Sequence, residues 1–254
     1  MKKIAVLTAL LFAALQIGYA QKVGLVLSGG GAKGAAHIGV IKALEENGIP
    51  IDYITGTSAG AIVGSLYAMG YTPEEMVELM LSEEFSYWQT GTVENEYKYY
   101  FKRPDPTPEF GHFSIDMTDS LQVKASFLPQ SLINPIQMNQ AFMALFSQAT
   151  AKAGWNFDNL FVPFRCVASD IYSKKAIIFK NGDLGDAVRA SMTFPFFFQP
   201  IWKDSVPIFD GGIYDNFPVG PMKEAFHPDF IFGSTVAGGN NKPSSNPYNQ
   251  LETM

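Results

Sequence analysis

The sequence contains very little cysteine and histidine. Its 254 residues include one cysteine, Cys166, and three histidines. A single cysteine cannot form an intrachain disulfide or supply a cysteine-rich metal site. Cys166 lies in an apolar stretch, where a buried structural thiol is expected. The sequence therefore predicts a fold that needs neither a disulfide framework nor a cysteine-bound metal.

An excess of positive charge is also missing. Lysine and arginine total 18 against 24 acidic residues, which gives a formal net charge of −6. Loss of Lys2 and Lys3 with an N-terminal leader would make this −8, because the leader holds no acid. Proteins that bind nucleic acid carry a basic footprint. We therefore expect no nucleic-acid partner, and any membrane contact must be hydrophobic or driven by substrate.

The N-terminal apolar run is too short for a comfortable membrane span. The longest early run, residues 4–17, follows Lys2 and Lys3 and ends at the small-residue site Gly18-Tyr19-Ala20. This is the pattern of a secretory signal peptide. We therefore predict a signal peptide over residues 1–20 and a mature chain that begins near Gln21. Such a chain is exported, to the periplasm, the outer membrane or the cell surface.

The remaining 234 residues (254 minus 20) fit one α/β domain over residues 21–237. Strand and helix patterns alternate, which predicts a three-layer α/β/α sandwich with a mainly parallel central sheet. Strands are expected at 23–28, 51–55, 164–169, 175–180, 206–209 and 230–236, and helices at 35–47, 61–69, 73–81, 135–152 and 186–191. Residues 238–254 have the composition of a loop or linker. Because no helix follows the last strand, we expect this to be the front part of a longer protein.

A stretch with little periodicity lies between about residues 85 and 133. It is rich in tyrosine and phenylalanine and is broken by three prolines, Pro104, Pro106 and Pro108. A long irregular insertion in a compact domain is usually functional or mobile. Two interpretations stay open: a lid beside a catalytic cleft, or a surface excursion with its own small aromatic core.

The most specific motif is Gly56-Thr57-Ser58-Ala59-Gly60. It follows a short β-like run and precedes a helical stretch, so it is Gly-x-Ser-x-Gly in strand-turn-helix context. This arrangement lifts a serine hydroxyl above a sheet on a tight turn. Gly56 and Gly60 allow the neighbouring strand and helix to approach closely. Ser58 is therefore a candidate nucleophile, whereas an incidental serine in a glycine turn is the alternative.

A second glycine cluster, residues 29–34, follows the first predicted strand. It formally matches the dinucleotide fingerprint Gly-x-Gly-x-x-Gly. The next strand, however, does not end in the acid that grips a ribose, and Ala32 before Lys33 also breaks the Walker pattern. Backbone amides at a helix N-terminus can instead stabilise an oxyanion. We favour an oxyanion pocket made by Gly29, Gly30 and Gly31, with Lys33 adding a positive charge beside it.

A serine nucleophile needs a base, and two candidates stand downstream. Ser58, Asp210 and His227 follow the chain order of an α/β-hydrolase triad. His227 lies at a helix end without a glycine-rich loop to deliver it. Asp210 ends a predicted strand and is followed by Gly211 and Gly212, which permit close backbone approach. If strand ends gather at one sheet edge, Asp210 meets Ser58 directly, and partial burial would raise its pKa enough to accept a proton.

The other two histidines fit structural positions. His37 lies one helical turn beyond Lys33 and is expected to be a buried or supporting helix residue. His112 lies in the irregular insertion and is expected to be exposed.

In this order, residues 29–34, Gly56–Gly60 and Asp210-Gly211-Gly212 resemble the three motifs of the patatin-like phospholipases, in their exported bacterial form. The segment 187–191, followed by Pro195 and Pro200, is also similar to that family, and the resemblance spans about residues 22–236. It implies a lipid acyl hydrolase with a Ser58–Asp210 dyad and no metal or organic cofactor. The implied substrate is a phospholipid or another fatty-acyl ester, with a membrane surface as its source.

The acyl chain needs an apolar site. The chain has 21 phenylalanines, and a cluster near the family-like segment is a candidate lining: Phe194, Phe196, Phe197, Phe198 and Trp202. Ordinary core packing is the alternative. Two other functions stay open: a carboxylesterase with the Ser58-Asp210-His227 triad, and a catalytically silent binding or secretion module. Dinucleotide binding is the least favoured alternative.

Overall fold

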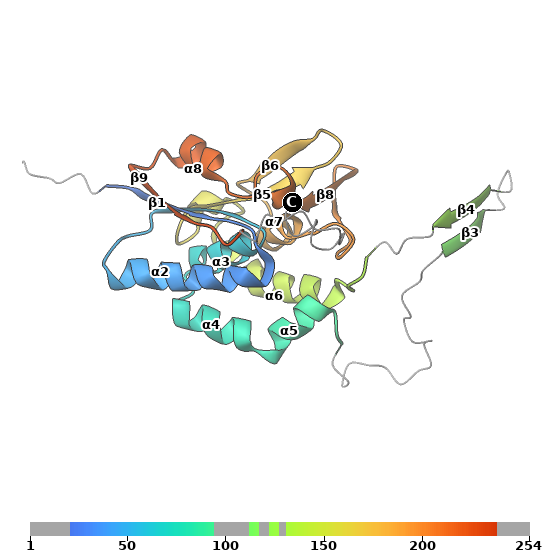
Figure 1. Cartoon of the computed structure of the whole chain (residues 1–254), viewed down its shortest axis with the longest axis horizontal. Coiled ribbons are helices and arrows are strands. Elements are labelled where there is room, and N and C mark those ends of the chain that lie inside the picture. The colour runs from blue at the N-terminus through green and yellow to red at the C-terminus, as the bar shows by residue number, and fades with distance from the viewer. Residues whose placement is uncertain (1–20, 94–111, 117–121, 127–130, 238–254) are drawn as a thin grey trace, which may run out of the picture.

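The computed structural model describes residues 21–93, 112–116, 122–126 and 131–237. The predicted signal peptide, residues 1–20, and the predicted linker, residues 238–254, lie outside the described residues. A single sheet runs through the middle of the main body, as Figure 1 shows.

Seven strands form the central sheet, and the last of them in sequence lies at one edge. The order is β7-β8-β5-β2-β1-β9, with β6 also paired to β5. The strand bounds are β1 Val23–Leu27, β2 Tyr53–Thr57, β5 Phe164–Asp170, β6 Lys175–Phe179, β7 Ile201–Lys203, β8 Val206–Asp210 and β9 Phe230–Ser234. The pairs β9–β1, β1–β2 and β2–β5 are parallel.

Helices cover both faces of this sheet and complete three layers. On one face, α3 packs on β2 and β5, and α7 packs on β5. On the other face, α8 packs on β1 and β2, and Figure 1 shows it on the opposite side from α2, α3 and α6. The helix bounds are α2 Ala36–Glu46, α3 Ala59–Ala68, α4 Pro73–Leu81, α5 Glu83–Thr90, α6 Ile136–Lys152, α7 Leu184–Ser191 and α8 Val219–Phe226. The predicted α/β/α sandwich is confirmed.

The sheet is mixed, because an antiparallel part is joined to its parallel strands at β5. Strands β6 and β8 both pair antiparallel with β5, and β7 pairs antiparallel with β8. Strand β7 was not predicted, since it has three residues and carries two exposed positions. Hairpins join β5 to β6 and β7 to β8, so these strands need no crossover helix.

The predicted irregular insertion is partly regular. It begins with α5, which starts at the Ser82 cap, and it also contains an antiparallel pair, β3 His112–Asp116 and β4 Gln122–Ser126. Helix α5 has no buried residue, so its sequence lacks the apolar repeat by which a helix can be recognised. The remaining residues between 94 and 130 lie outside the description, so the lid and the surface excursion both stay predictions.

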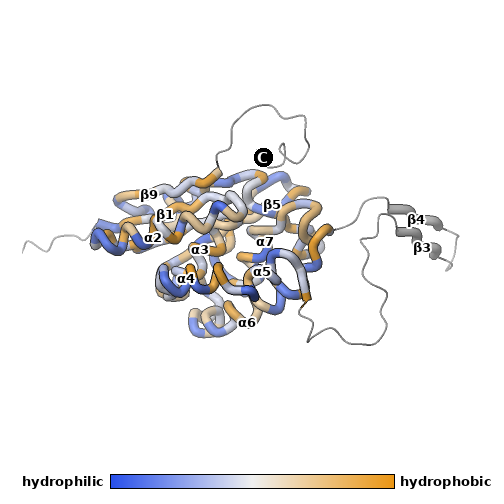
Figure 2. The backbone as a smooth tube through the Cα atoms, turned by 60° about the horizontal axis from the view of Figure 1, so that its bottom comes forward, coloured by the Kyte–Doolittle hydropathy of each residue, from blue (hydrophilic) through white to orange (hydrophobic). Residues whose placement is uncertain are grey.

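The core lies between the sheet and the layer of α2, α3, α6 and α7. Its largest fully buried side chains include Phe146, Phe157 and Phe164. Cys166 is also fully buried in this cluster, as predicted, and burial raises the pKa of its thiol. Helix α3 has eight of ten residues buried, and hydrophobic colour runs through the middle of the body in Figure 2. This buried helix fixes the position of the turn that precedes it.

Three helix ends form where the sequence indicated them. Gly48, with φ of 67°, closes the end of α2 and donates its N–H to the Glu45 carbonyl at 2.9 Å. Thr72 and Glu75 form the predicted capping box at the start of α4. Gly70 also adopts a positive φ after α3. Within the described ranges, no helix combines the length and the apolar character needed to cross a bilayer.

Replacing Thr72 by alanine is expected to lower the free energy of unfolding by about 1 kcal/mol, because the Glu75 amide loses its side-chain acceptor. Thr72→Ser keeps that acceptor and should restore most of the loss. Chemical denaturation measures both effects. Glu78→Ala, at an exposed position of the same helix, is the control and should stay within about 0.5 kcal/mol of wild type. A loss no larger than the control's would contradict the capping role.

Candidate active site

Strand β5 brings together the two strand ends that carry the predicted site. It pairs with β6 through residues 166–170, which occupies one of its edges. Strands β2 and β8 pair with residues 164–167 and 168–170 respectively, so they must share the other edge. Thr57 is opposite Val167 and Asp210 is opposite Ala168. The end of β2 therefore meets the end of β8 head to head, and Ser58 arrives beside Asp210.

Ser58 occupies the sharp turn between β2 and α3. Its backbone has φ of 53° and ψ of −120°, a conformation that side-chain-bearing residues rarely adopt. The turn points the backbone N–H of Ser58 toward the Ser191 hydroxyl at 2.9 Å, and that hydroxyl donates to the Val167 carbonyl at 2.6 Å. Ser191 thus bridges β5 to the turn at the place where strand pairing stops.

The supporting glycines are required by close backbone approach. A Cβ at Gly56 would overlap the backbone of Gly60, and one at Gly60 would overlap the backbone of Leu27. At Gly211 a Cβ would collide with the Val167 carbonyl. These three positions let the turn, β1 and β5 pack at the distance that places Ser58 next to Asp210.

Ser58 and Asp210 are joined by a direct hydrogen bond. The Ser58 Oγ donates to Asp210 Oδ2 at 2.7 Å, and the Gly212 N–H donates to Oδ1 at 2.7 Å. The Asp210 backbone N–H is bound to the Thr193 carbonyl at 2.8 Å. Asp210 is only 6% exposed. Burial raises its pKa to about 6, although the hydrogen bonds from Ser58 and Gly212 oppose that rise.

The glycine loop lies against this pair, but its amides are not equivalent. A Cβ on Gly29 would approach the Ser58 Cβ to 3.1 Å, so the loop and the turn are in contact. The Gly29 N–H is bound to the Asn216 carbonyl at 3.1 Å, which removes it from the predicted set of three oxyanion donors. Among the described residues, no backbone partner accepts from Gly30 or Gly31. Lys33 is exposed in the short 3₁₀ turn Gly31–Ala35.

Two of the histidines, His227 and His37, lie away from the Ser58 hydroxyl. His227 is exposed at the left-handed C-cap of α8, with φ of 47°. Within the described residues, no hydrogen bond joins it to Ser58 or Asp210. His37 is fully buried, as predicted, and binds Ser234 and the Ser28 carbonyl. His112 begins β3 rather than lying in an irregular segment.

Two residues at the site were not assigned a role from the sequence. Ser191 lies in the segment 187–191 that resembles the family, and this was its only signal. Asn216 holds Gly29 through its backbone, and its side chain lies where a Cβ on Gly29 or Gly212 would stand. Nothing in the sequence around Asn216 indicated that contact, because it depends on how the chain returns after Asp210.

The predicted acyl-site aromatics differ in exposure and form three sets. Phe198 is 8% exposed and packs in the core, while Phe194 and Phe197 are partly buried and stack edge to face at 5.6 Å. Phe196 and Trp202 are more than half exposed. Core packing therefore accounts for Phe198, and the exposed pair stays available for contact with an apolar ligand.

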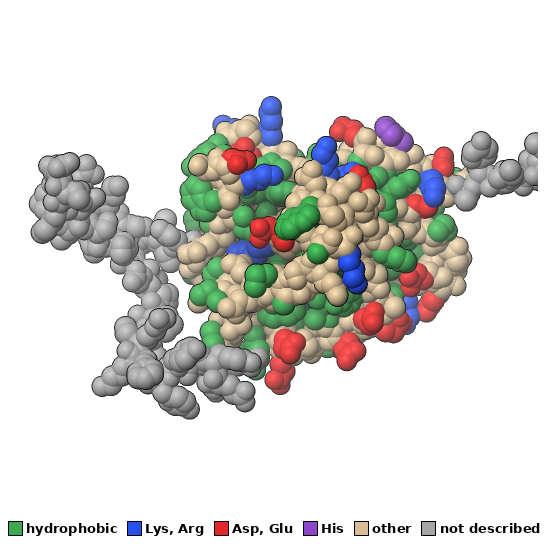
Figure 3. Space-filling view, turned by 180° about the vertical axis from the view of Figure 1, so that it is seen from behind, with side chains coloured by type: hydrophobic (Ala, Val, Ile, Leu, Met, Phe, Trp, Pro, Cys, Tyr) green, Lys and Arg blue, Asp and Glu red, His purple; other side chains and the backbone are tan. Residues whose placement is uncertain are grey.

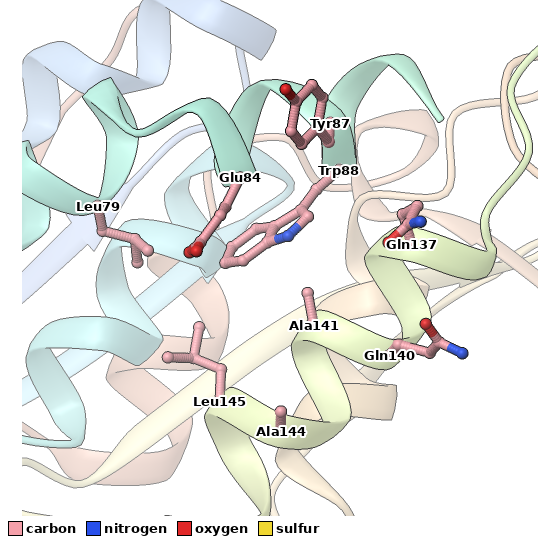
Figure 4. A pocket seen from close by; sticks show the side chains of 9 residues that line it. All are labelled: Leu79, Glu84, Tyr87, Trp88, Gln137, Gln140, Ala141, Ala144 and Leu145. Atoms are coloured by element: carbon pink, nitrogen blue, oxygen red, sulfur yellow. The ribbon is translucent and has the colours of Figure 1, made fainter. Parts of the chain in front are cut away.

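A separate groove lies between α5 and α6, with a volume of about 510 Å³. Figure 4 shows the Trp88 ring of α5 above Ala141 of α6, with Glu84 beside the ring and Ala144 further along α6. The groove is completed by Leu79, Tyr87, Gln137, Gln140 and Leu145. None of the predicted site residues lines it.

Charged side chains of both signs lie on one face of the described part of the protein. On the face shown in Figure 3, lysine and arginine side chains stand singly among acidic ones rather than forming one basic patch. Two exposed ion pairs, Lys22–Asp52 at 2.7 Å and Lys42–Glu74 at 2.9 Å, follow this pattern.

Comparison with known proteins agrees with this geometry. A sequence model of the family described as patatin-like phospholipase matches residues 25–223. The chain belongs to the patatin-like phospholipase family. Family membership places the domain among the serine-dependent lipid ester hydrolases.

Two relatives show the extent of the match. Lysophospholipase NTE1 of Pyricularia oryzae is 31% identical over 217 residues, which cover 85% of this chain and 12% of that protein. A patatin-like phospholipase domain-containing protein of Caenorhabditis elegans is 29% identical over 203 residues, 79% of this chain and 12% of its own length. The chain thus spans about an eighth of these relatives.

A solved structure shares the fold. VipD from Legionella pneumophila aligns with a TM-score of 0.51 over 87% of this chain and 51% of its own, at 16% sequence identity. At this identity the likeness concerns the fold alone.

The strain at the turn can be measured by comparing two substitutions of Ser58. Glycine adopts a positive φ without steric cost, whereas alanine keeps the Cβ. Both variants lack the hydroxyl. We expect Ser58→Gly to exceed Ser58→Ala in free energy of unfolding by about 1 kcal/mol, measured by chemical denaturation. Gly220, helical and with open space around its Cβ position, is the control, since Gly220→Ala should not destabilise. Equal stability of the two Ser58 variants would show that the turn stores no strain.

Proposed function

We propose that this patatin-like domain is a lipid acyl hydrolase of the phospholipase A or lipase type, with Ser58 as nucleophile and Asp210 as its base. The observation that carries the proposal is the 2.7 Å hydrogen bond from the Ser58 hydroxyl to a buried carboxylate. A carboxylate whose pKa is raised to about 6 is a stronger base than an exposed aspartate, and it is still ionised at neutral pH.

The first half-reaction forms an acyl-enzyme. The Ser58 Oγ attacks the carbonyl carbon of the ester while Asp210 Oδ2 accepts the hydroxyl proton. Collapse of the tetrahedral intermediate breaks the bond to the leaving alcohol, and Asp210 returns the proton to that oxygen. Water then attacks the acyl-Ser58 carbonyl with Asp210 again accepting a proton, which releases the fatty acid and restores the serine.

The negative oxygen of the intermediate needs donors. The Gly30 and Gly31 amides of the glycine loop are the remaining candidates, and α3 begins directly after Ser58, so its positive end is also close. Each well-placed donor contributes roughly 100- to 1,000-fold to the rate.

The substrate is proposed to be a phospholipid or another fatty-acyl ester presented at a membrane surface. The exposed rings of Phe196 and Trp202 are suited to contact acyl chains, and each buried methylene contributes about 0.8 kcal/mol. The relative from Pyricularia oryzae is named as a lysophospholipase. The N-terminal pattern of residues 1–20 supports export, to the periplasm, the outer membrane or the cell surface.

The alternative triad has less support. Both Asp210 oxygens already accept hydrogen bonds, from Ser58 and Gly212. His227 is exposed at the end of α8. An imidazole between Ser58 and Asp210 would have to displace the bond that joins them.

Substituting Asp210 and His227 one at a time distinguishes a Ser-Asp dyad from a Ser-Asp-His triad. Asp210→Asn keeps the shape but cannot accept a proton, so kcat/KM for a fatty-acyl p-nitrophenyl ester should fall by about 1,000-fold or more. His227→Ala should stay near wild type. The reverse pattern would establish the triad. Wild-type protein that neither hydrolyses the ester nor reacts with a fluorophosphonate probe at Ser58 would instead indicate a silent binding module.

Activity should also depend on pH through Asp210. The carboxyl must be ionised to act as base, and its pKa is raised to about 6. We therefore expect kcat/KM to be flat near neutral pH and to fall about tenfold per pH unit below about 6. Asp215 is the control, because burial also raises its pKa but it does not touch Ser58. Asp215→Asn should leave the acid limb in place; if the limb disappears in that variant, Asp215 sets it.

A further inference from the structure

A buried histidine lies beneath the glycine loop. His37 of α2 is fully buried between the ends of β1 and β9. Its Nδ1 is 2.7 Å from the Ser234 Oγ, and its Nε2 is 2.9 Å from the Ser28 carbonyl oxygen. The residue therefore ties the last residue of β9 to the residue that immediately precedes Gly29.

The partners of His37 fix its protonation. A carbonyl oxygen can only accept, so Nε2 must carry the proton. A neutral ring then accepts at Nδ1 from the Ser234 hydroxyl. Burial lowers the pKa of His37, although the hydrogen bond to Ser28 opposes this. The ring is a neutral connector with both nitrogens used, and it has no nitrogen left for Ser58.

Ser28 passes this arrangement on to the loop. Its N–H donates to the Ser234 carbonyl at 3.0 Å. Its hydroxyl donates to the Gly29 carbonyl at 3.0 Å and accepts from the Val236 N–H at 2.9 Å. Every polar group of this buried residue is therefore paired. Two of these bonds hold the peptide carbonyls before and after the Gly29 α-carbon: the Ser28 carbonyl is bound to His37, and the Gly29 carbonyl is bound to the Ser28 hydroxyl.

The two held carbonyls fix the directions of the Gly29 and Gly30 N–H groups. In a trans peptide the C=O and N–H point in opposite directions. Holding the Ser28 carbonyl toward His37 aims the Gly29 N–H away from it, onto Asn216. Holding the Gly29 carbonyl toward Ser28 aims the Gly30 N–H away from that hydroxyl, and no described backbone group accepts from it.

We propose that His37 is a positioning residue that acts through Ser28 to aim the Gly30 amide at the oxyanion formed on Ser58. This inference rests on the proposed function, since the oxyanion exists only if Ser58 attacks an ester. His37 holds the donor in place before substrate arrives and takes no part in proton transfer.

The experiment compares two replacements of the ring. His37→Phe fills the space but removes both hydrogen bonds, whereas His37→Gln offers an amide that can donate to Ser28 and accept from Ser234. In His37→Phe we expect kcat for a fatty-acyl p-nitrophenyl ester to fall by about 100-fold, as for loss of one oxyanion donor. KM should stay within about twofold, since the loop acts on the transition state. His37→Gln should recover most of kcat.

A matched control separates positioning from general stability. Thr150 is also buried, and its hydroxyl accepts from the Leu184 N–H at 3.2 Å on the α6–α7 side. Thr150→Val should lower the thermal midpoint without changing kcat. Ser28→Ala leaves the His37 ring in place but frees the Gly29 carbonyl, so it should lower kcat by about 10-fold or more, and it tests the same idea should His37→Phe fail to fold.

The outcomes are distinct for the two proposals. Wild-type kcat in folded His37→Phe and Ser28→Ala, with Ser58→Ala inactive, would overturn the positioning role and leave the hydrolase intact. The positioning role would also be overturned if His37→Gln lost as much activity as His37→Phe and its residual kcat/KM no longer fell at low pH. That result would indicate that His37 acts as a base. A wild-type protein without esterase activity would instead refute the proposed function.

Discussion

The junction at Val167 and Ala168 of β5 is the constraint on which the site depends. Two strands of opposite direction, β2 and β8, end against each other on this one edge. Thr57 and Asp210 are opposite the consecutive residues Val167 and Ala168. Position 211 must be glycine because the Val167 carbonyl oxygen lies where a Cβ would stand. The strained turn at Ser58 and the buried position of Asp210 are both consequences of this meeting.

The pKa of Asp210 at this junction is set mainly by its burial. Desolvation raises the pKa of Asp210 while two hydrogen bonds lower it, and the balance falls at about 6. Burial also lowers the pKa of His37, which is bound to the Ser28 carbonyl just before the glycine loop. The proposed arrangement therefore differs from a Ser-Asp-His triad. The proposed base, Asp210, is bound directly to the Ser58 hydroxyl, whereas the His37 imidazole belongs to a structural hydrogen-bond network.

Much of this could be predicted from local sequence, and the failures have physical reasons. Glycine spacing around Ser58 and the Thr72 capping box are local signals, and both formed as expected. The meeting of Ser58 and Asp210 was expected for the wrong reason, since β8 runs antiparallel to β5 and does not share its carboxyl edge. Strand direction depends on pairing partners, which an apolar run of five residues does not specify. Helix α5 was missed because it buries none of its residues.

The sequence by itself determined most of the central strands and helices, the turn at Ser58 and the glycines that permit it. Backbone conformation and close approach there depend on which residue stands at each position. Only the tertiary structure decided which polar groups meet. The Gly29 amide is taken by Asn216, Ser191 bridges the strand end to the turn, and His37 reaches from α2 to Ser234 of the last strand. Such contacts join residues far apart in the chain, and their partners are chosen by the path of the folded backbone.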